Sequence, residues 1–360
     1  MLPAQPGREL QASAELSLLI DASARTDLGR VRKNNEDAVR IEPALDLCVL
    51  SDGMGGQAHG EVASAMAVEM IVAHCNESRN DPDITLFGSS RPDLCERTNR
   101  LMSAVRMANR KIFDAAARNP EHEGMGATIV AAWLDDRRMS LVHVGDSRAY
   151  LLRAGSLEQL TADHSLVAEH VRRGTMTRQE AETSQLQNIL IRALGTTDQV
   201  EVDADEQILI EGDTVLLCSD GLTHMVSDPE IASILSTVEP AQAAAGRLVE
   251  LANENGGMDN VTVIVIRVLP EAGGLMARLR GRSKLARPGG PARKAGNSLG
   301  ICVVTQFETA LQSNAVIPGA ARFLRPGWVC GARDLLFAAG RQIFKLRHCR
   351  DLIRIWQGSS

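Results

Sequence analysis

The chain has 360 residues, of which 44% are apolar and 23% are charged, and it carries a net charge of −6. This apolar content is enough for one large folded domain or two ordinary ones. Seven scattered cysteines without a CxxC pair argue against a disulfide framework or a cysteine zinc site. No apolar run approaches the length of a membrane-spanning helix, and residues 1–20 lack a signal-peptide pattern, so we expect a cytoplasmic protein.

Charge is distributed unevenly along the chain. Residues 271–360 contain 15 Lys and Arg against 4 Asp and Glu, a net of +11, which leaves −17 for residues 1–270. Residues 271–300 are also rich in Gly, Pro, Arg and Lys, a composition typical of a flexible linker. We therefore predict a mobile N-terminus (1–20), a folded domain (21–270), a linker (271–300) and a C-terminal extension (301–360).

The first predicted strand that ends in a candidate metal-binding carboxylate lies at residues 47–50. This apolar run leads to Asp52, which Gly53 follows directly. A glycine lets the backbone turn sharply, so its carbonyl can approach whatever the acid binds. A carboxylate beside a carbonyl oxygen suits Mg²⁺ or Mn²⁺ better than Zn²⁺. Taken alone, the pattern is more often a simple turn at the end of a strand.

Two helices and three strands are predicted next. Val62, Met66 and Met70 have helical spacing, and a second amphipathic helix is predicted around residues 101–112. Strands are predicted at residues 128–133, 139–144 and 149–152, with Asp146 in the tight connection between the last two. Strands in sequential runs with helices grouped between them suggest sheets that are covered by helices on their outer faces.

The Ser-Asp-Gly pattern occurs a second time. An apolar strand at residues 215–218 ends in Ser219-Asp220-Gly221. Asp259 follows a glycine turn and immediately precedes the β-branched strand at residues 261–266. Two copies, together with a third acid at a strand end, are harder to explain as turns alone, so we predict that these acids converge.

Carboxylates gathered in this way repel one another unless cations lie between them. Two metal ions about 3.5–4 Å apart lower the pKa of a bridging water and hold a phosphoryl group in line for attack. Such a site also needs a cation that grips the phosphate, and a bidentate arginine is the best candidate. Arg32, four residues before Glu36-Asp37, is our prediction for this role.

Six motifs in a fixed order resemble those of the metal-dependent protein Ser/Thr phosphatases of the 2C type, and the bacterial branch most of all. They lie at residues 32–37, 52–56, 145–150, 160–165, 219–222 and 259–262, within a match that spans roughly residues 20–268. The resemblance implies an α+β fold, an αββα four-layer sandwich of two antiparallel sheets flanked by helices. It also implies a site for two Mn²⁺ or Mg²⁺ ions, with a third in bacterial members.

The resemblance implies a role for each of these residues. Asp52 bridges the metals and the Gly53 carbonyl binds one of them, whereas Asp220 and Asp259 complete the other. Glu36 and Asp37 support the site through water, and Asp146, with Asp220, helps hold the third ion. Residues 163–190 correspond to a flap that influences substrate choice. The implied reaction is hydrolysis of phosphoserine and phosphothreonine on proteins by a hydroxide that bridges the metals.

One position departs from many relatives in this family. They have His where this chain has Met54, and that His is thought to protonate the leaving group. Methionine cannot do so, which leaves a metal-bound water or another group as the donor. His59 and His164 are close in the motifs, and we interpret each as a surface or hydrogen-bonding histidine.

Two functions from different classes remain open at this point. The first is a hydrolase that acts in signal transduction on phosphoproteins and opposes a bacterial Ser/Thr kinase. Its expected partners are that kinase and its substrates, and we expect the chain to be a monomer. The second is a pseudoenzyme that binds phosphoproteins without hydrolysing them. The chain keeps every predicted metal acid and Arg32, which favours the enzyme.

The C-terminal extension suggests two further alternatives. Residues 335–356 alternate apolar and basic side chains, a pattern that predicts a basic amphipathic helix. Such a helix could lie at an anionic membrane surface or on an acidic protein partner. It could equally pack as an ordinary helical addition or stay disordered. Nucleic acid is not an expected partner, because apolar residues dilute the arginines.

Overall fold

A computed structural model describes residues 19–55, 59–81, 83–182, 184, 186–270, 335–339 and 342–346. The chain divides into two compact units, residues 1–283 and 284–360. The predicted linker and most of the predicted mobile N-terminus lie outside the described residues. The predicted domain boundaries therefore stay predictions.

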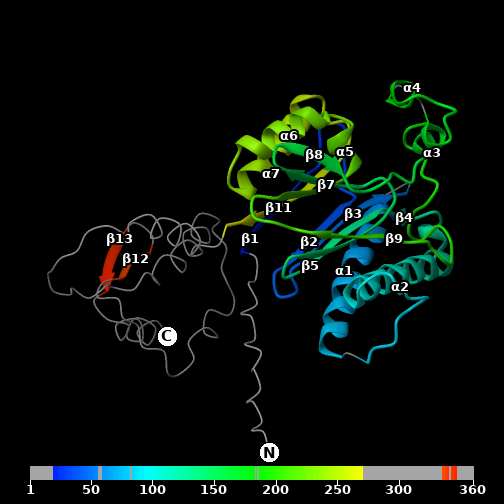
Figure 1. The fold of residues 1–360 in the computed structure, drawn as a ribbon, viewed down its shortest axis with the longest axis horizontal. Coiled ribbons are helices and arrows are strands. Elements are labelled where there is room, and N and C mark those ends of the chain that lie inside the picture. The colour runs from blue at the N-terminus through cyan, green and yellow to red at the C-terminus, as the bar shows by residue number, and fades with distance from the viewer. Residues whose placement is uncertain are drawn as a thin grey trace, which may run out of the picture. The chain divides into compact units, whose positions relative to one another are not determined.

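Two antiparallel sheets form the centre of the first unit (Figure 1). Sheet 1 has the strand order β1-β11-β10-β7-β8, with β1 (Leu19–Asp27), β7 (Arg148–Arg153), β8 (Ser156–Gln159), β10 (Thr214–Cys218) and β11 (Val261–Leu269). Sheet 2 has the order β2-β3-β5-β6-β9, with β4 paired to β3; its strands are β2 (Asp37–Glu42), β3 (Leu47–Met54), β4 (Gly126–Ala127), β5 (Ile129–Asp135), β6 (Arg138–Val144) and β9 (Asp203–Ile208).

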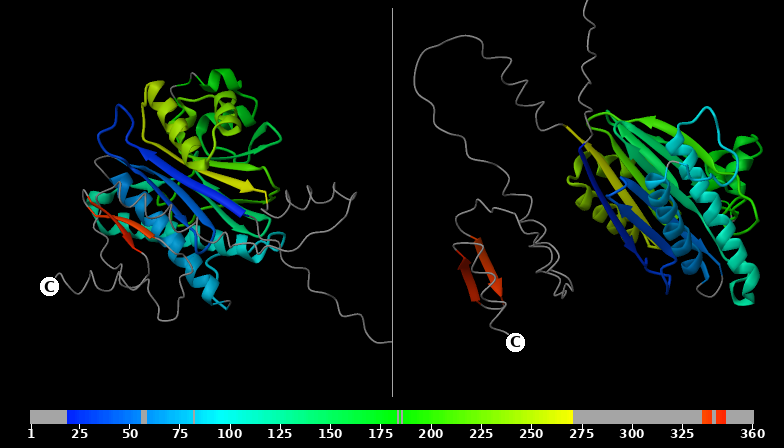
Figure 2. Two further views of the ribbon diagram at one scale, coloured as in Figure 1. Left: turned by 90° about the vertical axis from the view of Figure 1, so that its left-hand side faces the viewer. Right: turned by 90° about the horizontal axis from the view of Figure 1, so that it is seen from below.

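Helices cover the outer face of each sheet, as Figures 1 and 2 show. Sheet 2 packs against α1 (His59–Asn80) and α2 (Glu96–Arg118), and a short 3-10 helix, η1 (Pro120–His122), follows α2. Sheet 1 packs against α5 (Asp220–Thr223), α6 (Asp228–Thr237) and α7 (Ala241–Glu254). The short helices α3 (Leu166–Arg172) and α4 (Arg178–Glu182) lie in a separate excursion from the layers.

Alternation along the strands explains the layers. In β3, Leu47 and Val49 pack towards α1 and α2, whereas Cys48 and Leu50 point into the core between the sheets. Side chains of successive strand residues point to opposite faces, so one fully apolar strand supplies two cores. The four-layer αββα sandwich predicted from the sequence is confirmed.

Strand register brings the ends of the acid-bearing strands together. In sheet 2, Asp37 at the start of β2 pairs with Asp52 near the end of β3. In sheet 1, Cys218 at the end of β10 pairs with Val263 of β11 and with Arg148 at the start of β7. The segments that carry Asp146, Asp220 and Asp259 therefore leave sheet 1 at one end.

The start of α2 is held by a carboxylate from β9. Glu206 Oε1 accepts hydrogen bonds from the Cys95 backbone N–H and from the Thr98 hydroxyl, both at 2.6 Å, and Arg138 pairs with Oε2. Although burial acts in the opposite direction, these hydrogen bonds lower the pKa of Glu206 from 4.5 to about 2. Glu206 thus fixes the first turn of α2, whose N-cap residue, Cys95, makes no side-chain capping hydrogen bond.

Replacing Glu206 with Gln should lower the free energy of unfolding at pH 7 by roughly 1–2 kcal/mol, because the hydrogen bonds lose their charged acceptor. The folded-state pKa is depressed, so this stabilisation is complete above the unfolded pKa of 4.5 and is lost as the pH falls towards 2. Urea unfolding at pH 7 and pH 4 should therefore show a smaller difference at pH 4. Asp205→Asn, an exposed neighbour on β9, is the control. An equal loss at both pH values would contradict this explanation.

In the second unit the described residues form two antiparallel strands, β12 (Leu335–Ala339) and β13 (Gln342–Leu346), with Ala339 paired to Gln342. The predicted amphipathic helix is wrong at these positions. Gly340, within the predicted helix, disfavours it by about 1 kcal/mol relative to Ala, and Ile343 and Phe344 favour strands. The remainder of 301–360 lies outside the described residues. None of the helices among the described residues is long and apolar enough to cross a bilayer.

Candidate metal centre

The predicted metal acids meet at one end of the two sheets. Burial, and then the neighbouring carboxylates Asp37, Asp220 and Asp146, raise the pKa of Asp52 well above its usual value. Burial and the charge of Asp220 also raise the pKa of Asp37 to about 7 and that of Asp146 to about 8. Carboxylates shift one another in this way only when they are close together. The carboxylates of this cluster come from both sheets, and they lie together as we predicted from their positions at strand ends.

Asp37 is fixed from sheet 1 although it belongs to sheet 2. Its Oδ2 accepts hydrogen bonds from the hydroxyls of Thr262 at 2.6 Å and Ser219 at 3.1 Å. Its Oδ1 is buried without a hydrogen-bond partner. A buried carboxylate oxygen without a donor is costly, and a water bound to a divalent cation would satisfy it. The hard oxygen donors of this cluster fit Mg²⁺ or Mn²⁺.

Close backbone packing explains the glycine after Asp52. The Gly53 N–H donates to the Glu36 carbonyl at 3.1 Å, and a Cβ on Gly53 would lie 2.1 Å from the carbonyl oxygen of Gly60. Only glycine allows the end of β3 to lie this close to the first turn of α1. The backbone that Gly53 packs against is that of α1. The approach of its carbonyl to a bound cation stays a prediction.

Asn260 ties three backbone segments together beside the cluster. Its Nδ2 donates to the carbonyls of Leu28 at 3.0 Å and Asn34 at 2.9 Å, and its Oδ1 accepts from the Glu36 N–H at 2.8 Å. Burial raises the pKa of Glu36, while the charge of Arg32 opposes this shift. Our sequence analysis missed this role, although Asn260 follows Asp259 in a recognised motif.

Arg32 lies at the edge of the cluster and contacts one of the predicted metal acids. Its Nη2 is 2.7 Å from Asp259 Oδ2, with 49% of the Arg32 side chain and 27% of the Asp259 side chain exposed. The hydrogen bond to Asp259 raises the pKa of Arg32, and the charges of Glu36 and Asp52 add to it. The guanidinium is thus held next to the carboxylates and open to solvent. Its contact with phosphate stays a prediction.

Buried hydroxyl groups support Asp52, a feature that sequence analysis also missed. The Asp52 N–H donates to Thr128 Oγ1 at 3.0 Å, and Thr128 Oγ1 lies 2.7 Å from the hydroxyl of Ser147. The Ser51 hydroxyl donates to the Thr128 carbonyl at 2.7 Å. The serine in each Ser-Asp-Gly copy was the available signal, because Ser51 and Ser219 both turn inward to fix the site.

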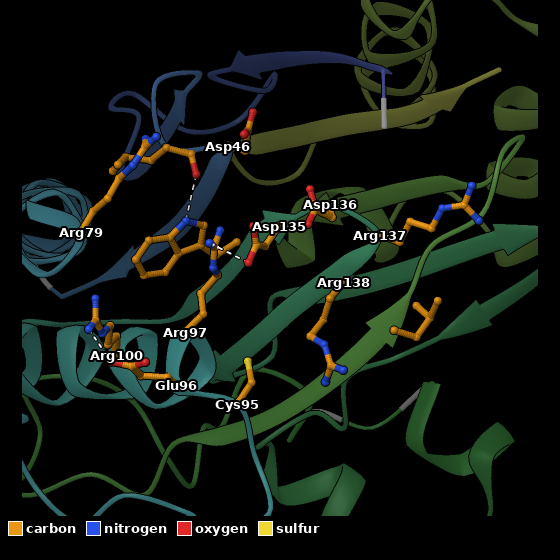
Figure 3. Close-up of a pocket in the computed structure, with 13 residues that line it drawn as sticks. Asp46, Arg79, Cys95, Glu96, Arg97, Arg100, Asp135, Asp136, Arg137 and Arg138 are labelled. Atoms are coloured by element: carbon orange, nitrogen blue, oxygen red, sulfur yellow. Dashed lines mark hydrogen bonds and ion pairs between the residues drawn. The ribbon is translucent and has the colours of Figure 1, made fainter. Parts of the chain in front are cut away.

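A separate pocket of about 680 Å³ lies at the opposite end of sheet 2 (Figure 3). Five arginines and four acids line it: Arg79, Arg97, Arg100, Arg137, Arg138, Asp46, Glu96, Asp135 and Asp136. Arg97 lies over the Trp133 ring and pairs with Asp135 at 2.8 Å. The acids offset most of the positive charge, so this pocket lacks the electrostatics of a phosphate site, and we assign the chemistry to the carboxylate cluster.

The structure combines a four-layer αββα sandwich with carboxylates that converge at one end of its two sheets. The chain belongs to the protein phosphatase 2C family, whose model matches residues 30–254. This match covers more than half of the chain and includes most of the predicted site.

Bacterial relatives of known name are similar to this chain. The serine/threonine protein phosphatase PstP of Mycobacterium tuberculosis is 40% identical over 256 residues, which are 71% of this chain and 46% of that protein. The chain therefore matches about half the length of PstP. The serine/threonine phosphatase stp of Listeria welshimeri is 37% identical over 248 residues, 68% of this chain and 94% of that protein.

Solved structures share the fold. The catalytic domain of PstP, in complex with two manganese ions, has a TM-score of 0.60 and 40% identity, and the match covers 71% of this chain and all of that one. Stp1 from Staphylococcus aureus has a TM-score of 0.62 and 33% identity, with 74% of this chain and all of that one covered.

Proposed function

We propose that this chain is a metal-dependent protein phosphatase that hydrolyses phosphoserine and phosphothreonine on proteins. The observation that carries the proposal is the cluster of buried carboxylates at one end of the two sheets, where burial and the charges of neighbouring carboxylates raise the pKa values of Asp37, Asp52 and Asp146. Such a cluster costs stability unless cations neutralise it. Membership of the protein phosphatase 2C family and the manganese-bound relative support the same conclusion.

The residues take the following roles in this proposal. Asp52, the Gly53 carbonyl, Asp220 and Asp259 hold two Mn²⁺ or Mg²⁺ ions, Asp146 helps hold a third, and Glu36 and Asp37 support the site through water. The bound cations supply a water nucleophile at neutral pH and stabilise charge on the phosphoryl group. Arg32 binds the phosphate oxygens from the open edge of the cluster. The Met54 side chain can neither give nor take a proton.

We also propose that the substrates are phosphoproteins of a bacterial Ser/Thr kinase and that the chain acts as a monomer. A contact of residues 271–360 with an anionic membrane surface or a protein partner is the remaining part of the proposal. Its only support is the basic charge of that segment.

Replacing Arg32 with Ala should raise KM for a phosphopeptide by roughly tenfold or more and change kcat less, because phosphate binding in the ground state is lost. Arg32→Lys keeps the charge but not the bidentate geometry, so its KM should be intermediate. Steady-state kinetics with and without Mn²⁺ measure both constants. Arg40→Ala, an exposed arginine on β2, is the control.

The same assay separates enzyme from pseudoenzyme. A wild-type chain that binds phosphopeptide but shows no Mn²⁺-dependent turnover is a phosphoprotein-binding pseudoenzyme, and the proposed activity is then wrong. An unchanged KM in Arg32→Ala, with turnover intact, would remove Arg32 from the phosphate site only.

A further inference from the structure

The turn that carries Asp146 is held by a histidine from the start of the segment after β8. Gly145 has a φ of +107°, and a Cβ there would lie 2.7 Å from Thr128, so the turn requires glycine. The backbone N–H of Gly145 donates to the ring atom Nδ1 of His164 at 3.1 Å, and the backbone N–H of His164 donates to the Gly145 carbonyl at 3.0 Å. Both backbone groups of the residue before Asp146 are therefore bonded to His164.

One neutral tautomer of the His164 imidazole fits its contacts with Gly145 and Asp203. Because Nδ1 accepts from Gly145, a neutral ring carries its proton on Nε2. Nε2 lies 3.2 Å from Asp203 Oδ2, so this N–H donates to the carboxylate. The ring of His143 stacks on that of His164, with centroids 4.7 Å apart and an angle of 20°. The His164 side chain is only 2% exposed, so the ring is confined on all sides.

Asp203 is itself fixed by an arginine. Arg192 Nη1 lies 2.6 Å from Asp203 Oδ1 and donates to it, and it lies 3.1 Å from His164 Nε2. Because a guanidinium has only donors, this second contact is not a hydrogen bond when Nε2 carries the proton, and Arg192 acts on the ring through Asp203. Hydrogen bonds from His164 and Arg192 hold the pKa of Asp203 well below its usual value, so the carboxylate stays charged. Ligand atoms of His143, His164 and Asp203 lie within 4.8 Å of one another, as in a cation site. The guanidinium of Arg192 supplies positive charge beside two of them, which favours a supporting role over a further metal site.

We propose that Asp203 and Arg192 fix the tautomer of His164, and that His164 thereby holds the Gly145 turn where Asp146 can bind a divalent cation. His164 and Asp203 are then positioning residues rather than catalytic ones. An aspartate that orients a histidine, which in turn orients a metal acid, is an outer shell of the kind that tunes metal affinity. The inference rests on the proposed function in one respect, because it takes Asp146 as a metal acid.

Two substitutions of His164 separate its two ring nitrogens. Asn can place its amide oxygen near the position of Nδ1 and accept from the Gly145 N–H, whereas Gln reaches the position of Nε2. Titration calorimetry of the full chain with Mn²⁺ should show the site that includes Asp146 losing roughly tenfold or more in affinity in His164→Gln. In His164→Asn the loss should be clearly smaller. Equal losses in the two variants would overturn the inference.

The tautomer can be measured directly. Imidazole ¹⁵N NMR shifts of the metal-free chain should show the proton of His164 on Nε2, and Asp203→Ala should populate both tautomers. Asp205→Ala, two residues along β9 and exposed, should leave the spectrum unchanged. A proton on Nδ1 in the wild type, or an unchanged His164 spectrum in Asp203→Ala, would also overturn it. A wild-type chain that binds no Mn²⁺ refutes the proposed function instead, whereas the tautomer test does not depend on metal.

Discussion

Replacing Asp52 with Asn is expected to abolish Mn²⁺-dependent hydrolysis of a phosphopeptide, with a loss of roughly a thousandfold or more, since removing even an outer-shell partner of a metal costs 10–100-fold. Asp52 is the acid whose pKa is raised by three other carboxylates, so it lies at the centre of the cluster. Asparagine keeps the shape of the side chain but offers one neutral oxygen in place of a charged pair. Asp259→Asn should have a similar effect. Initial rates at several Mn²⁺ concentrations provide the measurement.

The melting temperature of Asp52→Asn shows whether its activity is lost because a metal acid is missing or because the chain has unfolded. Without metal, Asp52→Asn removes one of several mutually repelling carboxylates, so its Tm should equal or exceed that of the metal-free wild type. Asp205→Asn is the control with wild-type activity. Retained activity in Asp52→Asn would falsify the assignment, and a Tm well below that of the wild type would show that unfolding caused the loss.

Replacing Gly221 with Ala should destabilise the chain by roughly 3 kcal/mol or more, at the upper end of what overpacking costs. A Cβ at this position would lie 2.0 Å from the Asn260 carbonyl oxygen, and backbone cannot yield as a flexible side chain does. Gly221 follows Asp220 directly and Asn260 follows Asp259, so any relaxation separates two predicted metal acids. The free energy of unfolding, measured with urea, and the rate of phosphopeptide turnover should therefore both fall.

Gly246 provides the matched control for this glycine. It lies within α7, and no atom comes within 4 Å of a Cβ built there. Gly246→Ala should stabilise the chain by roughly 0.5–1 kcal/mol, because Ala loses less conformational freedom in a helix. If both substitutions destabilised the chain equally, the close approach at Gly221 would not be the cause.

The central sheets and the ends where their acids lie could be predicted from the sequence because the signals are local. Apolar strands that end in an acid and a glycine mark the segments of Asp52 and Asp220, and the β-branched run after Asp259 marks β11. Pairing, such as that of Cys218 with Val263, is non-local. The convergence of the acids therefore followed from the recurrence of a pattern and from family resemblance, not from strand register.

Other features depend on contacts that no local pattern carries. Residues 76–80 are all polar, yet α1 continues to Asn80, because Ser78 is buried and its hydroxyl donates to the Cys75 carbonyl at 3.0 Å. The bond from Thr262 to Asp37 joins residues 225 positions apart. Tertiary packing decides such positions, and composition alone predicts the opposite.

The mixed origin of the carboxylates has a mechanical consequence. Asp37 and Asp52 lie in strands of sheet 2, Asp220 and Asp259 adjoin strands of sheet 1, and Asp146 lies in the connection from β6 of sheet 2 to β7 of sheet 1. Cations held between them would join the two sheets at one end, while the core between the sheets is an apolar cluster. Removing divalent ions would then weaken the contact between the two sheets at this end as well as abolish the proposed activity.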